Sequence, residues 1–199
     1  MISDIYYHIY NRGAHKADIF LDGSDYVRMV KLLYIANNDE PFVMRELPEN
    51  IFLIERRHPL IDIVAYCLMP NHVHIAVKKI AAREPGTRDN LTCFLHKLMT
   101  AYSTYFNIKY GHSGTIWQGA CKGKTVDDGL YIRTLINYIH LNPCGIKGQG
   151  ITKPASDEYG AEAVKFATDY EYSSLKDYAG IKRQQVSILS LEEMAKFRP

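Results

Sequence analysis

The feature that most constrains the fold is a long apolar run that turns back on itself. Leu60–Met69 is almost continuously apolar, a Pro-Asn pair follows, and alternation resumes in His72–Lys78. Pro and Asn favour tight turns, so the segment predicts an antiparallel β-hairpin. Because successive side chains on a strand point to opposite faces, His72 and His74 point the same way. The hairpin therefore has one apolar face that can pack against a core and one polar face that can carry a functional site.

Two imidazoles side by side on one strand are two ready ligands for a single divalent metal ion. The pair also has an ordinary explanation, because the chain contains eight histidines. A His-x-His pair on a half-exposed sheet is often only two hydrogen-bonded polar side chains. A metal site therefore requires a third ligand and a reactive group from elsewhere in the chain.

Composition narrows the class of protein. The chain has 199 residues, of which 47% are hydrophobic, and this is enough for one globular domain with its own core. The net charge of +2 does not by itself indicate nucleic-acid binding. No apolar run approaches the roughly 20 residues that span a bilayer, so we expect no membrane partner. The four cysteines are widely spaced, which predicts reduced thiols in a cytoplasmic protein.

Apolar residues at helical spacing and runs of β-forming residues place further elements along the chain. We interpret residues 40–58 as a long connection that includes a short strand at 51–54. Interleaved strands and helices around one clear hairpin favour an antiparallel α+β fold with its helices on one face of the sheet. Besides the hairpin, we expect a strand at 5–10, extended pieces at 115–118 and 124–126, and helices at 24–36, 90–106, 128–142 and 191–197.

The predicted helix at 128–142 carries a second group of polar residues. Tyr138 and Asn142 are four residues apart and therefore share one helix face. If this face lies against the two histidines, Asn142 supplies an oxygen ligand and Tyr138 lies one turn away. Two imidazoles and one oxygen, with open positions, suit Mg²⁺ or Mn²⁺ holding a phosphate. Attack by a tyrosine hydroxyl on that phosphate would give a covalent phosphotyrosine.

Ordinary explanations exist for this second group as well. The chain contains fifteen tyrosines, so Tyr138 is equally well explained as a packed aromatic residue. Asn142 precedes Pro143, and such a residue is common where a helix ends. Spacing alone does not decide between these explanations and a site.

Several segments together resemble a known family, the single-tyrosine transposases with an HUH signature (His, bulky apolar residue, His). The resemblance is to the REP-associated tyrosine transposases in particular. Tyr66–His74 (YCLMPNHVH) resembles their HUH strand, Tyr138–Pro143 (YIHLNP) their tyrosine helix, and Tyr7–Gly13 (YHIYNRG) their first strand. Further likenesses occur at 102–106, 113–119 and 170–174. The likeness thus runs, with gaps, from about residue 5 to 180, so we treat 1–180 as one domain and 181–199 as a C-terminal extension.

The resemblance implies a ferredoxin-like α+β fold, an antiparallel sheet with helices packed on it, and an enzyme that uses Mg²⁺ or Mn²⁺. It implies cleavage and joining of single-stranded DNA with hairpin-forming repeats, through a 5′-phosphotyrosine and a free 3′-hydroxyl. By position, Tyr138 is the expected nucleophile, and His72, His74 and Asn142 are the expected metal ligands. Whether the protein acts as a monomer or a homodimer stays open.

The sequence also departs from the family pattern. Members often have Arg-Phe after Trp-Gln-Gly, where this chain has Ala120 and Cys121, and the stretch 40–58 is longer than usual. One DNA-contacting arginine is therefore missing. The residues that remain as predicted DNA contacts are Arg12, Trp117, Lys122, Lys124 and Lys147.

Two other functions stay open on these residues. A domesticated nucleic-acid-binding protein would keep the fold without turnover, and a metal-dependent phosphodiesterase would use water in place of Tyr138 as nucleophile. Among the other histidines, His8 and His15 have no partner in the sequence pattern, so we assign them no role in a site. His140 is interpreted as a structural residue or a substrate contact.

Overall fold

The computed structural model describes residues 5–80, 88–126, 129–147 and 161–198. Its centre is a four-stranded antiparallel sheet. In spatial order the strands are β2 (Ile61–Met69), β3 (His72–Lys79), β1 (Tyr6–Arg12) and β4 (Lys122–Val126). With α1 and α2 between strands, the chain order β1-α1-β2-β3-α2-β4 is the ferredoxin-like arrangement that the sequence predicts.

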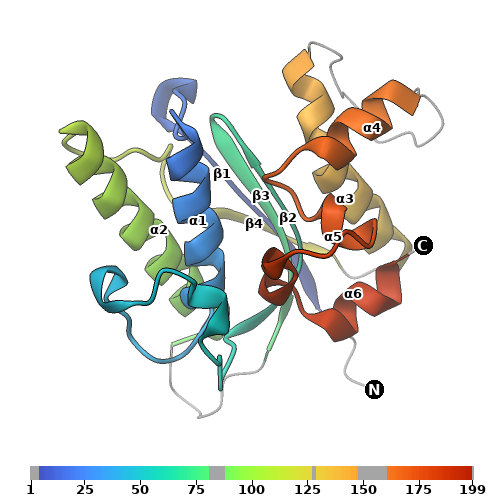
Figure 1. Cartoon of the computed structure of the whole chain (residues 1–199), viewed down its shortest axis with the longest axis horizontal. Helices are drawn as coiled ribbons and strands as arrows, with labels where there is room; N and C mark the ends of the chain where they lie inside the picture. Colours follow the sequence, from blue (N-terminus) through green and yellow to red (C-terminus); the bar gives the residue numbers. More distant parts are fainter. Residues whose placement is uncertain (1–4, 81–87, 127–128, 148–160, 199) are drawn as a thin grey trace.

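Helices cover both faces of the sheet (Figure 1). One layer contains α1 (Gly23–Ile35) and α2 (Asn90–Tyr110). The expectation of helices on one face only is therefore wrong. Its physical reason lies in β2 and β3, which are buried along most of their length and need cover on both sides. The second layer contains α3 (Gly129–Leu141), α4 (Ala161–Asp169), α5 (Leu175–Tyr178) and α6 (Leu191–Phe197).

The hairpin forms as predicted. Met69 pairs with His72, and the two residues between them make the turn. β1 then lies along the other side of β3, so that Tyr10 is opposite His74 and Arg12 is opposite His72. β1 extends two residues past the predicted end at residue 10, because this pairing continues to Arg12.

Local signals account for most helix ends. The Asp22 side chain accepts hydrogen bonds from the backbone N–H groups of Ser24 and Asp25 and begins α1. Gly111, at φ 59°, ends α2 beyond the predicted residue 106. The strand predicted at 51–54 is wrong. Ile51–Leu53 is a 3₁₀ turn capped by the Asn50 side chain, and the ladder gives it no partner strand.

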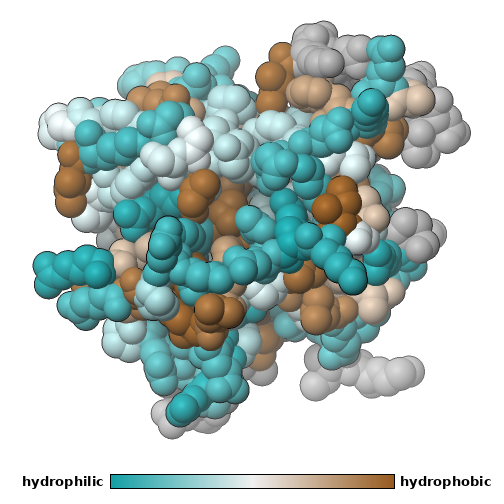
Figure 2. Space-filling view, viewed as in Figure 1, coloured by the Kyte–Doolittle hydropathy of each residue, from teal (hydrophilic) through white to brown (hydrophobic). Residues whose placement is uncertain are grey.

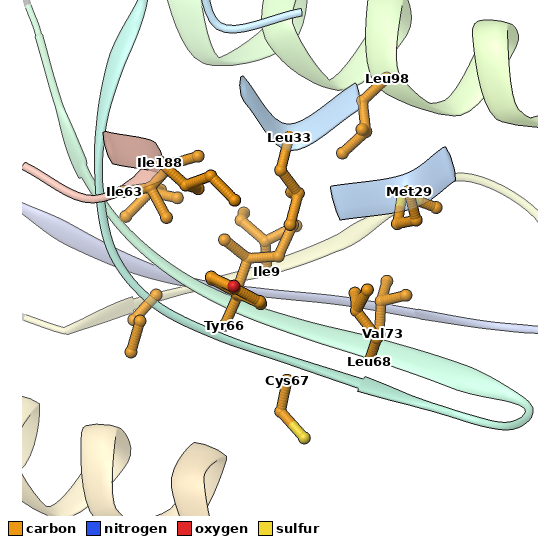
Figure 3. Close-up of a cluster of buried hydrophobic side chains, with 14 of the residues drawn as sticks. Ile9, Met29, Leu33, Ile63, Tyr66, Cys67, Leu68, Val73, Leu98 and Ile188 are labelled. Atoms are coloured by element: carbon orange, nitrogen blue, oxygen red, sulfur yellow. The ribbon is translucent and has the colours of Figure 1, made fainter. Parts of the chain in front are cut away.

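The hydrophobic core extends over both faces of the sheet, and Figure 3 shows its part between the sheet and the α1–α2 layer. Apolar side chains from β1, β2 and β3 meet those of the two helices, while Cys67 points to the opposite face, toward α3. This opposition follows from the alternation of side chains along β2. The labelled side chains on the α1–α2 side include Ile9, Met29, Leu33, Leu68, Val73 and Leu98.

The C-terminal part of the chain closes the free edge of β2. Ser173 forms a bridge with Cys67, and the Leu68 N–H donates to the Tyr172 carbonyl at 2.9 Å. An edge covered in this way cannot pair with another chain. Within residues 181–199, Ile188 and Met194 are buried in the same core as the sheet.

The surface carries apolar side chains in separate groups among hydrophilic ones on the face drawn in Figure 2. Among the described residues, the most exposed large apolar side chains are those of Leu53 and Ile108, which are each 79% exposed and belong to different elements. Throughout the described ranges, the helices are all too short or too polar to cross a membrane.

Candidate functional site

The polar face of β3 lies beneath α3 and carries both histidines of the His-x-His pair. Their ring centroids are 5.0 Å apart, with the ring planes at 89°. His74 is buried and His72 is half-buried. The strand alternation expected from the sequence is thus present, and both imidazoles face the same helix.

Tyr138 of α3 lies over this pair. Its ring meets the His74 ring edge to face, with centroids 5.5 Å apart, and the His8 ring with centroids 6.0 Å apart. Apolar residues of α3, Leu135 and Ile139 among them, are buried and hold the helix on the sheet. The packing of this helix brings together two groups of residues that lie more than sixty positions apart in the sequence.

Asn142 follows α3 directly and lies close to His72. Its Nδ2 atom donates a hydrogen bond to the Tyr138 carbonyl at 2.8 Å, as expected for residues four apart at the end of a helix. A hydrogen bond between the Asn142 and His72 side chains partly offsets the effects that lower the pKa of His72. Because Nδ2 is engaged by the Tyr138 carbonyl, the amide oxygen is the atom of Asn142 that would bind a metal ion.

His8, to which the sequence assigned no role, belongs to the site. Its Nε2 atom lies 2.8 Å from Nδ1 of His74 on the adjacent strand, and the two rings stack at 5.0 Å. The signal was present in the alternation of β1, because His8, Tyr10 and Arg12 share one face. The alternation of β1 alone does not place His8 in the site, because that placement depends on the pairing of β1 with β3.

Each of the two candidate histidine ligands has its Nδ1 atom engaged by a neighbouring side chain. The Asn71 Oδ1 atom is 2.6 Å from Nδ1 of His72, and since a carboxamide oxygen only accepts, His72 Nδ1 carries the proton. His74 Nδ1 is engaged by His8. Nε2 is thus the nitrogen through which His72 and His74 would bind a metal ion, with each ring oriented by the partner of its Nδ1 atom.

The three histidines are neutral at pH 7. Burial, and after it the charge of Lys124, lowers the pKa of His8 to about 4. Burial and then Arg12 lower the pKa of His72 to about 4, and burial together with its neighbours takes that of His74 well below its usual value. Neutral imidazole is the form that binds a metal ion.

The donor set fits a divalent ion that shares its coordination with a substrate. Among the described residues, no three or more His, Cys, Asp or Glu side chains are grouped to hold a metal. Two imidazole nitrogens and the Asn142 oxygen leave several positions for phosphate oxygens and water. The residues present thus fit a divalent ion that would take its remaining ligands from water or from a bound anion.

A cavity of about 840 Å³ opens over these side chains. This volume is large enough for a small organic ligand or a short piece of a polymer. Its lining combines the candidate ligands with cations and amides from β1, the hairpin turn and β4. The polar lining residues include Arg12, Asp18, Asn71, His72, His74, Gln118, Lys122, Tyr138 and Asn142.

The predicted DNA contacts fall into different environments. Arg12 and Lys122 are exposed at the cavity, and Lys124, also exposed, follows on β4 with its Nζ atom 5.6 Å from the Tyr131 ring centroid. Lys147 ends the 3₁₀ segment Asn142–Lys147, and its side chain lies outside what the structure describes.

The burial of Trp117 contradicts its prediction as a DNA contact. It is only 5% exposed, its Nε1 atom donates to Ser103 Oγ at 3.0 Å, and its ring packs against Tyr102. A ring enclosed in this way offers no face on which a base can stack, so Trp117 is a core residue. His140 is likewise buried, with Nε2 2.8 Å from Ser174 Oγ, which selects the structural interpretation.

No protein-family model matches the chain, and no curated protein matches it. A solved structure described as a REP-associated tyrosine transposase bound to a REP hairpin is similar. The alignment covers 93% of this chain and 86% of that chain, with a TM-score of 0.51 and 14% sequence identity. The two proteins share a fold. At this identity the activity has to be argued from the site itself.

Proposed function

We propose that this chain is a metal-dependent endonuclease and strand transferase for single-stranded DNA, with Tyr138 as its nucleophile. One observation carries the proposal: the Tyr138 ring lies against His74, with centroids 5.5 Å apart, inside a cavity that is also lined by Arg12 and Lys122. A hydroxyl nucleophile, imidazoles that can bind a metal ion and cations that can hold phosphates are groups that enzymes use for phosphoryl transfer.

The side chains divide the chemistry among them. His72, His74 and Asn142 would hold Mg²⁺ or Mn²⁺, which supplies positive charge to the phosphate oxygens when bound. Tyr138 Oη gives its proton to a water molecule and attacks the phosphorus of a phosphodiester, and the departing 3′-oxygen takes a proton from water. An O–P bond to Tyr138 forms as the bond from phosphorus to the 3′-oxygen breaks, which leaves a 5′-phosphotyrosine and a free 3′-hydroxyl. Attack by a 3′-hydroxyl on the same phosphorus reverses the step and joins strands.

The partner class follows from the rim of the cavity and from the fold. Arg12 and Lys122 provide guanidinium and ammonium groups for phosphates that flank the reacting one. The structure that shares this fold is bound to a REP hairpin. We therefore propose hairpin-forming single-stranded DNA as the substrate. All the named site residues come from one chain, and either a monomer or a homodimer is compatible with them.

A second candidate function is nucleic-acid binding without turnover. It is favoured by the candidate donor set of His72, His74 and Asn142, which contains no carboxylate, and by Ala120 and Cys121 in place of Arg-Phe. A pure binder has no use for Tyr138 above the histidine pair, which is why we place this function second.

The test uses a library of single-stranded oligonucleotides, each with one hairpin and randomised flanks, labelled at the 3′ end and incubated with the protein and Mn²⁺. We expect a labelled protein adduct that survives denaturation, and its loss in Tyr138→Phe. The matched control is Tyr131→Phe on the same helix, where the ring is 47% exposed, and it should retain the adduct.

The other outcomes separate the alternatives. Cleavage that persists in Tyr138→Phe without an adduct identifies water as the nucleophile. Binding of the oligonucleotides without cleavage under Mg²⁺ or Mn²⁺ identifies the binding protein. Absence of any binding overturns all three functions.

A further inference from the structure

The segment that follows β1 combines backbone strain with exposed polar side chains. We define residues 13–18 as the β1 loop. Within it, His15 and Lys16 have φ values of 53° and 63°, in the left-handed region. In the described ranges they are the two non-glycine residues with positive φ, and both are exposed. L-residues with a Cβ atom enter this region at a cost, and such strain persists where the surroundings impose it.

Hydrogen bonds hold the β1 loop in this conformation. The Gly13 N–H donates to the Asn71 carbonyl at 2.8 Å, and the Ala14 N–H donates to the Ile116 carbonyl at 2.9 Å. The loop is closely packed on itself, because a Cβ atom on Gly13 would lie 2.1 Å from the Ala17 carbonyl oxygen. The His15 and Lys16 side chains are thus presented from a fixed backbone.

The Asn71 side chain joins the β1 loop to the candidate site. Its Nδ2 atom donates to the Lys16 carbonyl at 3.2 Å, and its Oδ1 atom accepts from Nδ1 of His72 at 2.6 Å. Arg12, which precedes the β1 loop, and Asp18, which is its last residue, line the cavity. The Asn71 side chain therefore fixes the position of the Lys16 backbone relative to His72.

We propose that the β1 loop is a phosphate-contact surface for single-stranded nucleic acid, with Lys16 and His15 binding backbone phosphates beside the one that reaches Tyr138. This inference rests on the proposed function. An ammonium group and an imidazole N–H both bind phosphate oxygens. Glycine at either position would relieve the strain. Because glycine would be less strained here, we infer that the side chains of His15 and Lys16 have a role of their own.

The test measures binding of a fluorescein-labelled single-stranded hairpin oligonucleotide by anisotropy at several KCl concentrations. The main variant is the double substitution His15→Gly and Lys16→Gly, which keeps the backbone conformation and removes both side chains. We expect its melting temperature to rise by about 2–6 °C, because strain is released. We expect its affinity to fall about tenfold in roughly 0.1 M salt, and the salt slope to fall by about 1.

Two controls accompany it. Lys16→Arg keeps the charge and should bind as the wild type does, while Lys182→Gly removes an exposed lysine from the segment after α5 and should change affinity less than twofold. If the double variant is unstable, Lys16→Asn gives the same comparison, since Asn tolerates the left-handed region.

The outcomes are distinguishable from failure of the proposed function. Wild-type protein that does not bind the oligonucleotide overturns the proposed function. Wild-type protein that binds, with a double variant of unchanged affinity and salt slope, overturns the inference about the β1 loop alone.

Discussion

The Nε2 atom of His8 lies 2.8 Å from the Nδ1 atom of His74, across two neighbouring strands. If His74 binds a metal ion through Nε2, its Nδ1 carries the proton and donates to His8. A neutral acceptor at this point fixes both the tautomer and the ring orientation of His74. His8 is on this view a positioning residue for a candidate metal ligand.

His8→Phe should therefore lower the affinity for Mn²⁺ by about 10- to 100-fold, the usual effect of losing such a partner. His8→Gln keeps an acceptor oxygen and should recover part of the affinity. Calorimetric titration with Mn²⁺ measures both, and His96→Gln, an exposed histidine of α2, serves as the matched control. Equal Mn²⁺ affinity in His8→Phe and wild type would show that His8 has no such role.

Trp117 should matter for stability and not for DNA contact, because it is buried against Tyr102 and hydrogen-bonded to Ser103. Trp117→Ala should lower the free energy of unfolding by about 3–5 kcal/mol, measured by urea denaturation. Trp117→Phe should fold and bind single-stranded DNA with wild-type affinity. A folded Trp117→Phe protein with weakened DNA binding would restore the stacking role.

Asp25 should make the fold sensitive to acid. Burial alone would raise the pKa of Asp25, but hydrogen bonds from Lys109 and Tyr110 outweigh it and hold the pKa below its usual value. A carboxylate of this kind contributes stability that is complete above its unfolded pKa of about 3.9 and is lost as the pH falls toward the folded pKa. The unfolding free energy should therefore decline below about pH 4.

Asp25→Asn tests this expectation. At pH 7 the variant should be less stable than the wild type by about 2–4 kcal/mol, because Lys109 loses its buried partner. The difference should narrow below about pH 4, where the Asp25 carboxylate of the unfolded wild-type chain takes up a proton while that of the folded protein is still ionised. Asp169→Asn, an exposed carboxylate on α4, is the control and should leave the pH profile unchanged. A constant difference from pH 7 to pH 3 would contradict the assignment.

Gly13→Ala should displace the β1 loop, because the new Cβ atom would lie 2.1 Å from the Ala17 carbonyl oxygen and 2.9 Å from the Ile19 side chain. We expect a loss of about 2 kcal/mol or more in unfolding free energy, since backbone has to move. Gly129→Ala meets nothing within 4 Å and should be neutral or slightly stabilising in the first turn of α3. Thermal melts of the two variants make the comparison.

The sequence by itself determined the features that depend on short-range geometry. Alternation along a strand put His72 and His74 on one face, the helical repeat put Tyr138 and Asn142 on another, and the Pro-Asn pair specified the hairpin. Each of these three features depends on backbone geometry over a few consecutive residues and not on contacts with distant parts of the chain.

Only the tertiary structure decided which of these faces meet. That α3 lies across the polar face of β3, that His8 reaches His74 and that Trp117 is buried all depend on strand order and on packing between distant segments. Hydrophobic burial is not directional, and many arrangements of the same amphipathic elements would satisfy it. The particular arrangement is set by the packing of side chains from the whole chain. Local sequence patterns carry no information about that packing.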